Sequence, residues 1–222
     1  PLDGRAGLTW VPVGPLHTGR AGVVDCVELA RPADRPAAPS LPLPAVLGLE
    51  PEFPFVGRAA AWESLVEAWD RAAGGGRRVV LVGGDAGTGK SRLVTELSRW
   101  VHQRGAAVLY GQCSEQSPVP YEPFAVALDL LMAGLDADGR QWLVGDRGQE
   151  LARLVPRLAA AAAVAADPAR EGSDDPGTER YRLFSAVVDT LATLAAERPV
   201  LLVLDDVHWA RRPTLELLDH LV

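Results

Sequence analysis

The clearest chemical signal in the chain is a glycine-rich segment of the form G-x-x-x-x-G-K-[ST]. It reads Gly84-Asp85-Ala86-Gly87-Thr88-Gly89-Lys90-Ser91 and contains no mismatch. Glycines at these positions let successive backbone N–H groups converge on one phosphate, and a helix that begins there adds the positive end of its dipole. We therefore predict a phosphate-binding loop, with a flexible glycine turn as the alternative.

Lys90 is the only lysine among the 22 basic residues of the chain, so a sequence that otherwise uses arginine keeps one ammonium group in this loop. That ammonium can reach the β- and γ-phosphates of a nucleotide, and we predict a catalytic role for it. Ser91 can supply a hydroxyl to Mg²⁺. Arg92 follows directly, at the start of the expected helix, and is included in the predicted nucleotide site.

Two adjacent carboxylates, Asp205 and Asp206, follow the apolar run 199–204. Open parallel sheets bind their ligands at the carboxyl ends of the strands, which is where these side chains would lie. Asp205 is the candidate for holding Mg²⁺, directly or through water, and Asp206 for orienting or deprotonating the attacking water. Taken alone the pair is more typical of a turn, and only the glycine loop favours the catalytic interpretation.

Weaker candidates surround these two motifs. Val56-Gly57-Arg58, after Phe55, could place backbone against an adenine, and a simple lead-in to a helix is the alternative. His208 could sense the γ-phosphate, although a lone histidine in a loop is more often structural. Gln112, at the end of a predicted strand, is a candidate to face the site, whereas Tyr121 and Phe124 are expected in the core.

Apolar patterns predict the elements that would position these residues. Amphipathic helices are indicated before and after the glycine loop by apolar residues at helical spacing: Trp62, Leu65, Val66, Trp69, and then Leu93, Leu97, Trp100, Val101. Continuous apolar runs predict buried strands over 78–82, 106–111 and 199–204. Further helices are expected over 122–133, 147–166, 179–197 and 214–222, with an acidic loop over 167–178. This alternation predicts an α/β fold with a parallel sheet flanked by helices.

The N-terminal part of the chain has a different character. Short β-like runs over 8–13 and 22–29, with turn signals at Gly14-Pro15 and Thr18-Gly19, predict a short β-rich segment within 1–30. The prolines between residues 32 and 44 forbid a regular helix or a central strand, so 31–50 is predicted to be a Pro-rich linker. Residues 51–222 are then the N-terminal part of a phosphate-binding domain.

Composition narrows the classes of function. The net charge of −7 argues against a nucleic-acid-binding surface, because binding phosphates of DNA or RNA needs a surplus of Lys and Arg. The longest strictly apolar run, 158–166, is far shorter than the ~20 residues that cross a bilayer, so no membrane segment is expected. Cys26 and Cys113 lie far apart without a CxxC pattern, which fits a reducing cytoplasm. A start at Pro1 and an end within a helical pattern suggest a fragment of a longer protein.

Five segments together resemble the AAA-type ATPase module of the bacterial signalling ATPases called STAND regulators. They are Phe55-Val-Gly-Arg58, the glycine loop, Tyr121-Glu-Pro-Phe124, Tyr181-Arg-Leu-Phe184 and Leu204-Asp-Asp-Val-His-Trp-Ala210. In that group the module commonly precedes tetratricopeptide-like repeats and often a LuxR-type helix-turn-helix, or follows a class III nucleotide cyclase domain. Residues 1–30 faintly resemble the end of such a cyclase domain.

The resemblance implies that ATP and Mg²⁺ are bound by a Walker A loop with Lys90 and Ser91, and by a Walker B pair with Asp205 and Asp206. The resemblance also implies that other domains of the parent chain are partners of this module, and it is compatible with a homo-oligomer. Arg211 stands where the family usually has Asp, so the helix that follows should lack its cap. The family's sheet also inserts a later strand between the glycine-loop strand and the Asp-Asp strand, so this segment would supply only half a site and can be inactive by itself.

Three functional hypotheses follow. The leading one is a nucleotide-controlled switch, in which ATP and Mg²⁺ hold one arrangement of the parent protein and slow hydrolysis releases it. The alternative is a binding module that senses ATP or ADP without significant hydrolysis. A small-molecule kinase would share the glycine loop, but it needs an acceptor pocket and an arginine-bearing lid that the sequence does not show.

Overall fold

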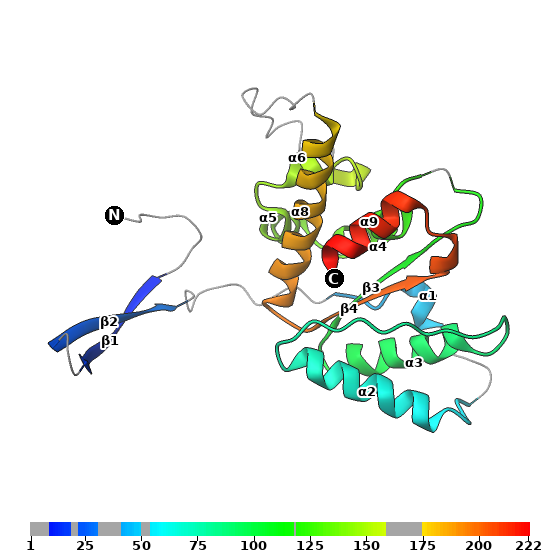
Figure 1. Ribbon diagram of the computed structural model, residues 1–222, viewed down its shortest axis with the longest axis horizontal. Coiled ribbons are helices and arrows are strands. Elements are labelled where there is room, and N and C mark those ends of the chain that lie inside the picture. Colours follow the sequence, from blue (N-terminus) through cyan, green and yellow to red (C-terminus); the bar gives the residue numbers. More distant parts are fainter. Residues whose placement is uncertain (1–8, 19–21, 31–40, 50–53, 118, 159–174) are drawn as a thin grey trace. The chain divides into compact units, whose positions relative to one another are not determined.

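In a computed structural model of the chain, the described residues are 9–18, 22–30, 41–49, 54–117, 119–158 and 175–222. They fall into two units, Pro1–Ala38 and Pro39–Val222 (Figure 1). The second unit contains every residue that the sequence places at the predicted site. Within the described ranges, no helix has the length and apolarity needed to cross a bilayer.

The described residues of the first unit form an antiparallel hairpin of β1 (Thr9–Thr18) and β2 (Gly22–Ala30). β1 continues through Gly14-Pro15, where we predicted a turn, so that prediction is wrong. The pairing shifts register between Pro12 and Gly14, and such a bulge accommodates an irregular residue without ending the strand. The turn signal at Thr18-Gly19 extends into residues outside the described part of the chain.

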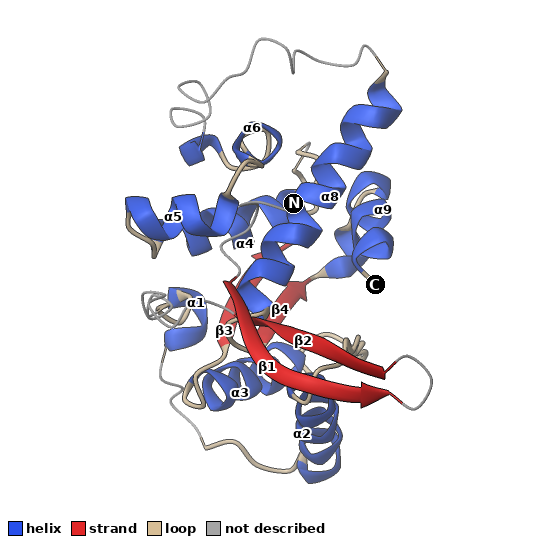
Figure 2. Ribbon diagram, turned by 90° about the vertical axis from the view of Figure 1, so that its left-hand side faces the viewer, coloured by secondary structure: helices blue, strands red, loops and turns tan. Residues whose placement is uncertain are grey.

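The second unit is built on two parallel strands, β3 (Ala107–Gln112) and β4 (Val200–Asp205). Their register runs from Ala107 opposite Val200 to Gln112 opposite Asp205. One face of the pair is covered by α2 (Ala59–Ala73) and α3 (Lys90–His102), and the other by α4 (Glu122–Ala133), α8 (Pro176–Ala195) and α9 (Arg212–Leu221) (Figures 1 and 2). The smaller elements are α1 (Ala45–Gly48), α5 (Ala137–Val144), α6 (Gly148–Leu151) and 3₁₀ turns at Pro156–Leu158 and Val207–Trp209. The predicted α/β class with a parallel sheet is confirmed.

Alternate residues of β3 enter two different cores, as expected of a parallel strand covered on both faces. Ala107 and Leu109 pack with α4, α8 and α9. Val108 and Tyr110 pack with α3 in the second core. β4 is less enclosed, because Val203 is its only buried residue. β4, which ends at Asp205 directly before Asp206, therefore keeps part of its surface accessible.

The predicted buried strand over 78–82 is not formed, and that prediction is wrong. Val79, Val80 and Leu81 are 53%, 49% and 84% exposed. A strand needs a hydrogen-bonded neighbour, and among the described residues β3 and β4 pair only with each other. An apolar run therefore leads into the glycine loop without the sheet contacts that its composition favours.

The predicted helices differ from the observed ones mainly at their ends. α4 occupies the predicted range, but the helix expected over 147–166 is broken: α6 ends at Leu151, and a 3₁₀ turn follows at Pro156–Leu158, where Pro156 has no N–H to continue a helix. Residues 159–174 lie outside the described part. α8 begins at Pro176, within the predicted acidic loop, because the Asp175 carboxylate accepts hydrogen bonds from the N–H groups of Gly177 and Thr178.

Residues 41–49, within the predicted linker, pack against the second unit. Leu41 and Leu47 are buried, one in each core. The Arg99 side chain of α3 donates to the carbonyl oxygens of Leu47 and Leu49, and His102 Nε2 lies 3.0 Å from the oxygen of Leu41. The single turn α1 forms despite our expectation of no regular helix, because Pro44 precedes it and the helix needs no N–H from that position.

Gly111 marks the closest approach of α4 to the sheet. A Cβ atom at this position would lie 1.8 Å from the carbonyl oxygen of Pro123, so no side chain fits there. The glycine at position 111 therefore lets α4 pack directly against β3.

Replacing Gly111 with Ala should force α4 away from β3. We expect Gly111→Ala to lower the free energy of unfolding by about 3 kcal/mol, which denaturant titration of the full-length protein can measure. Gly148→Ala is the matched control, because its Cβ would meet nothing nearer than Val144 Cγ1 at 3.6 Å. Equal stability of the two variants would contradict the close approach.

Candidate functional site

The glycine loop has backbone angles that favour glycine. Gly84 has a φ of +150° and Gly89, which directly precedes α3, a φ of +84°. A Cβ at Gly84 would lie 3.0 Å from Thr88 Oγ1, so a side chain would crowd the loop interior. Thr88 in turn donates to the carbonyl oxygen of Asp85 at 2.8 Å. The loop therefore closes on itself at the start of a helix, which is where backbone N–H groups and the helix dipole favour an anion.

Lys90, the first residue of α3, folds back over this loop. Its Nζ donates to the carbonyl oxygens of Gly84 at 2.8 Å and of Asp85 at 2.9 Å. The ammonium thus lies against the residues that we predict to surround a phosphate. A phosphate that enters the loop would compete with neutral carbonyl groups for this charge, and an ammonium bonded to an anion is held more strongly than one bonded to a neutral carbonyl.

Asp205 ends β4 beside the start of α3. Ser91 Oγ lies 3.3 Å from Asp205 Oδ2, so the two predicted metal ligands are brought together across 114 residues of sequence. Tyr110 OH donates to the same oxygen at 3.2 Å, and the backbone N–H of Asp206 donates to Oδ1 at 2.9 Å. The parallel register of β3 and β4 is what places Tyr110 near this carboxylate.

Asp206 has a left-handed backbone, with a φ of +53°, so the chain turns sharply after β4. Gln112 Nε2 donates to Asp206 Oδ2 at 2.9 Å, so this weaker candidate contacts the second carboxylate. His208 Nδ1 lies 3.9 Å from Asp206 Oδ1, and the His208 side chain is 64% exposed. His208 is therefore near the second carboxylate without a hydrogen bond to it.

Burial raises the pKa of two groups next to the carboxylates, Tyr110 and Cys113. Burial, and next the charge of Asp205, raises the pKa of Tyr110 to about 12, so its hydroxyl stays protonated and remains a donor at neutral pH. Burial, and next the charge of Glu122, raises the pKa of the Cys113 thiol. Cys113 is therefore a neutral, buried thiol.

The remaining candidates lie at varying distances from the loop. The guanidinium of Arg58 is 3.7 Å from the position of a Cβ at Gly89, whereas Val56 is mostly exposed. Arg92 pairs with Glu96 one turn along α3 at 2.8 Å. Arg211 precedes α9 and makes no side-chain cap, as predicted. Phe124 is buried and Tyr121 half-buried.

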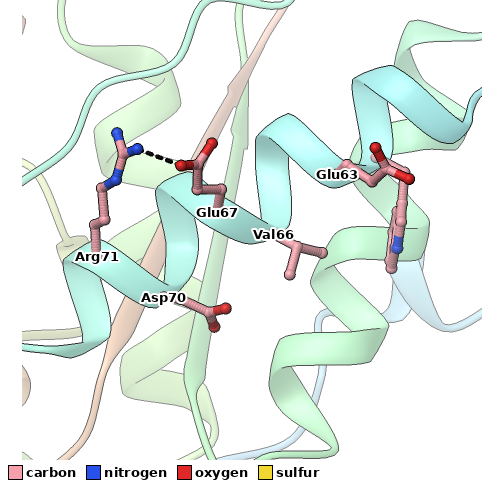
Figure 3. A pocket seen from close by; sticks show the side chains of 6 residues that line it. Glu63, Val66, Glu67, Asp70 and Arg71 are labelled. Carbon is pink, nitrogen blue, oxygen red and sulfur yellow. Dashed lines mark hydrogen bonds and ion pairs between the residues drawn. The ribbon is translucent and has the colours of Figure 1, made fainter.

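A surface hollow of about 530 Å³ lies elsewhere, along the outer side of α2. Figure 3 shows its lining, where Glu67 and Arg71 form an ion pair and Glu63, Val66 and Asp70 lie along the same helix. None of the residues that line it belongs to the glycine loop or to the carboxylate pair. A phosphate bound at the start of a helix is held by exposed backbone amides, so it needs no deep cavity.

Comparison with known proteins agrees with this geometry. A family model described as the AAA ATPase domain matches residues 54–222. The chain belongs to this family. A relative in Rhizobium meliloti (strain 1021), uncharacterized protein R02095, is 26% identical over 185 residues, which cover 74% of this chain and 17% of the relative. The chain thus spans about a sixth of that relative's length. No solved structure matches the present chain.

AAA ATPase domains typically bind ATP with Mg²⁺, and the residues present fit this ion. A serine hydroxyl and one carboxylate, held within 3.3 Å of each other, are the oxygen donors that Mg²⁺ takes from a protein when phosphates and water complete its shell. Among the described residues, no group of three or more His, Cys, Asp or Glu side chains gathers. Ser91 and Asp205 would hold the ion.

Sequence reasoning missed Tyr110, which contacts Asp205 directly. A signal for it was present: Tyr110 lies two residues before Gln112, so both side chains point to the same face of the predicted strand. Since Gln112 was a candidate for the site, the polar end of Tyr110 on that face was a candidate too.

Removing the Lys90 ammonium should weaken nucleotide binding. We expect Lys90→Ala to raise the Kd for ATP with Mg²⁺ at least ~10-fold, because a charge-assisted hydrogen bond to phosphate is lost. Isothermal titration calorimetry on the full-length protein measures this. Arg104→Ala is the control: it removes a cation that lies over the Trp100 ring, 3.7 Å from its centroid, after α3 ends. Equal affinities of wild type and Lys90→Ala would rule out this site.

Proposed function

We propose that the chain is an ATP-binding and ATP-hydrolysing switch module of a bacterial signalling or transcription regulator of the STAND type. The observation that carries the proposal is the contact of Ser91 with Asp205, which joins a glycine loop to a pair of carboxylates at the end of a parallel strand. Membership of the AAA ATPase domain family supports nucleotide binding at this place.

The phosphates lie on the backbone N–H groups of residues 84–91, the Walker A loop. Lys90 exchanges its bonds with the Gly84 and Asp85 carbonyls for bonds to phosphate oxygens. Ser91 and Asp205 hold Mg²⁺, which when bound neutralises charge that develops on the phosphates. Arg92, whose side chain is paired with Glu96, contributes through its backbone N–H at the start of α3.

Asp206 orients the attacking water and accepts its proton. The Gln112 amide donates to Oδ2 of Asp206, so the carboxylate is held in one orientation while Oδ1 remains for water. His208, near Oδ1, lies where it can respond to the γ-phosphate. Arg58, beside Gly89, adds positive charge at the loop, while Val56 and Gly57 approach the adenine through their backbone.

The remaining parts of the proposal concern the parent protein. The chain spans only a small part of the relative in Rhizobium meliloti, which leaves length for output domains in proteins of this kind. We infer that the module acts in the cytoplasm on other domains of its own chain, such as tetratricopeptide-like repeats, a helix-turn-helix or a cyclase domain. We also infer that it makes no direct contact with nucleic acid, which its net charge of −7 disfavours.

Replacing Asp206 with Asn separates hydrolysis from binding. We expect Asp206→Asn in the full-length protein to keep its affinity for ATP with Mg²⁺ and to lose ATP hydrolysis ~100-fold or more, because the general base is gone. Phosphate release under saturating ATP measures the rate, and calorimetry the affinity.

Asp219→Asn is the matched control, since it removes an exposed carboxylate from α9 away from β4. A wild-type protein that binds ATP without hydrolysing it would favour the alternative of a nucleotide sensor. A wild-type protein that transfers the phosphoryl group to a small molecule would favour a kinase.

A further inference from the structure

Tyr110 is a core residue whose hydroxyl reaches the site. It is 9% exposed and packs in the same core as Leu93 and Val101 of α3. Its OH lies 3.2 Å from Asp205 Oδ2 at the end of the neighbouring strand. A phenylalanine would fill the same space, so packing alone does not account for the hydroxyl.

The carboxylate of Asp205 is held from both ends. Its Oδ1 accepts from the backbone N–H of Asp206 at 2.9 Å, and its Oδ2 accepts from Tyr110 and from Ser91. An ionised carboxylate has about four acceptor positions, so these donors take most of them and leave room for a cation or its water. The Ser91 hydroxyl can donate its proton to Asp205 and still offer an oxygen lone pair to the cation.

We propose that Tyr110 is the positioning residue for the magnesium carboxylate: its hydroxyl fixes the orientation of Asp205 and thereby sets the affinity of the site for Mg²⁺. This inference rests on the proposed function. Hydrogen-bond partners of metal ligands hold those ligands in place, and their loss typically costs ~10- to 100-fold in metal affinity or activity.

β3 thus provides a separate hydrogen-bond donor for each of the two carboxylates. Tyr110 and Gln112 lie on the same face of the strand, and each donates one hydrogen bond, Tyr110 to Asp205 and Gln112 to Asp206. Loss of the first bond should change the dependence of nucleotide binding on Mg²⁺. Loss of the second should change the rate of hydrolysis. This difference separates positioning of the metal ligand from a general structural role.

The test is Tyr110→Phe in the full-length protein, with binding of a non-hydrolysable ATP analogue measured over a range of Mg²⁺ concentrations. We expect the Mg²⁺ concentration for half-maximal binding to rise ~10-fold, with wild-type binding restored at high Mg²⁺. Binding of ADP without Mg²⁺ should not change. Tyr121→Phe, which removes the hydroxyl of a half-buried tyrosine that packs on Phe184, should behave as wild type.

A second measurement uses Asp205→Asn, in which the Tyr110→Phe change should have no further effect on the Mg²⁺ dependence. The proposal is overturned if Tyr110→Phe needs no more Mg²⁺ than the wild type. It is equally overturned if the variant loses binding with and without Mg²⁺ alike, since that outcome assigns the residue a structural role. Failure of the wild type to bind adenine nucleotide with Mg²⁺ would instead contradict the proposed function.

Discussion

The parallel pairing of β3 with β4 is the constraint on which the site depends. It places Gln112 opposite Asp205 and so brings the polar end of one strand against the carboxylates that follow the other. Parallel strands end at the same edge of a sheet, so residues far apart in sequence meet there without any special loop. Ser91, at the start of α3, contacts Asp205 at the same edge. α3 itself packs on the strands through Leu93, Leu97 and Val101.

Contacts on both faces of the strand pair hold the helices that flank this edge. On one face, the carbonyl of Pro123 at the start of α4 occupies the space that a side chain at residue 111 would fill. On the other face, α3 begins at Lys90 and ends near Arg99 and His102, whose side chains contact the backbone of residues 41–49. The helix that begins at the glycine loop is therefore also the helix that anchors the chain segment preceding α2.

The charges at the site are satisfied locally in this structure. Lys90 is bound to loop carbonyls, Asp205 to a serine, a tyrosine and a backbone N–H, and Asp206 to a glutamine. None of these partners is itself charged, so a phosphate can compete with the loop carbonyls for Lys90, and a cation can take the acceptor positions of Asp205 that these donors leave free. Burial, and next the charge of Asp205, keeps the pKa of Tyr110 high, so its hydroxyl stays protonated beside the carboxylates.

The sequence by itself determined the fold class and most of the helices of the second unit, because apolar periodicity is encoded locally. Glycines for an anion loop and carboxylates after an apolar run likewise made Lys90, Ser91, Asp205 and Asp206 the candidates for the site, and the range of α4 was predicted correctly. Only the tertiary structure decided which strands pair, and so whether an apolar run becomes a strand at all. Residues 78–82 form no strand, and Val79, Val80 and Leu81 are exposed, since pairing depends on a neighbour that local composition does not specify. For the same reason the sequence did not predict the contact of Tyr110 with Asp205. The two residues are 95 positions apart, and the register of β3 against β4 brings them together.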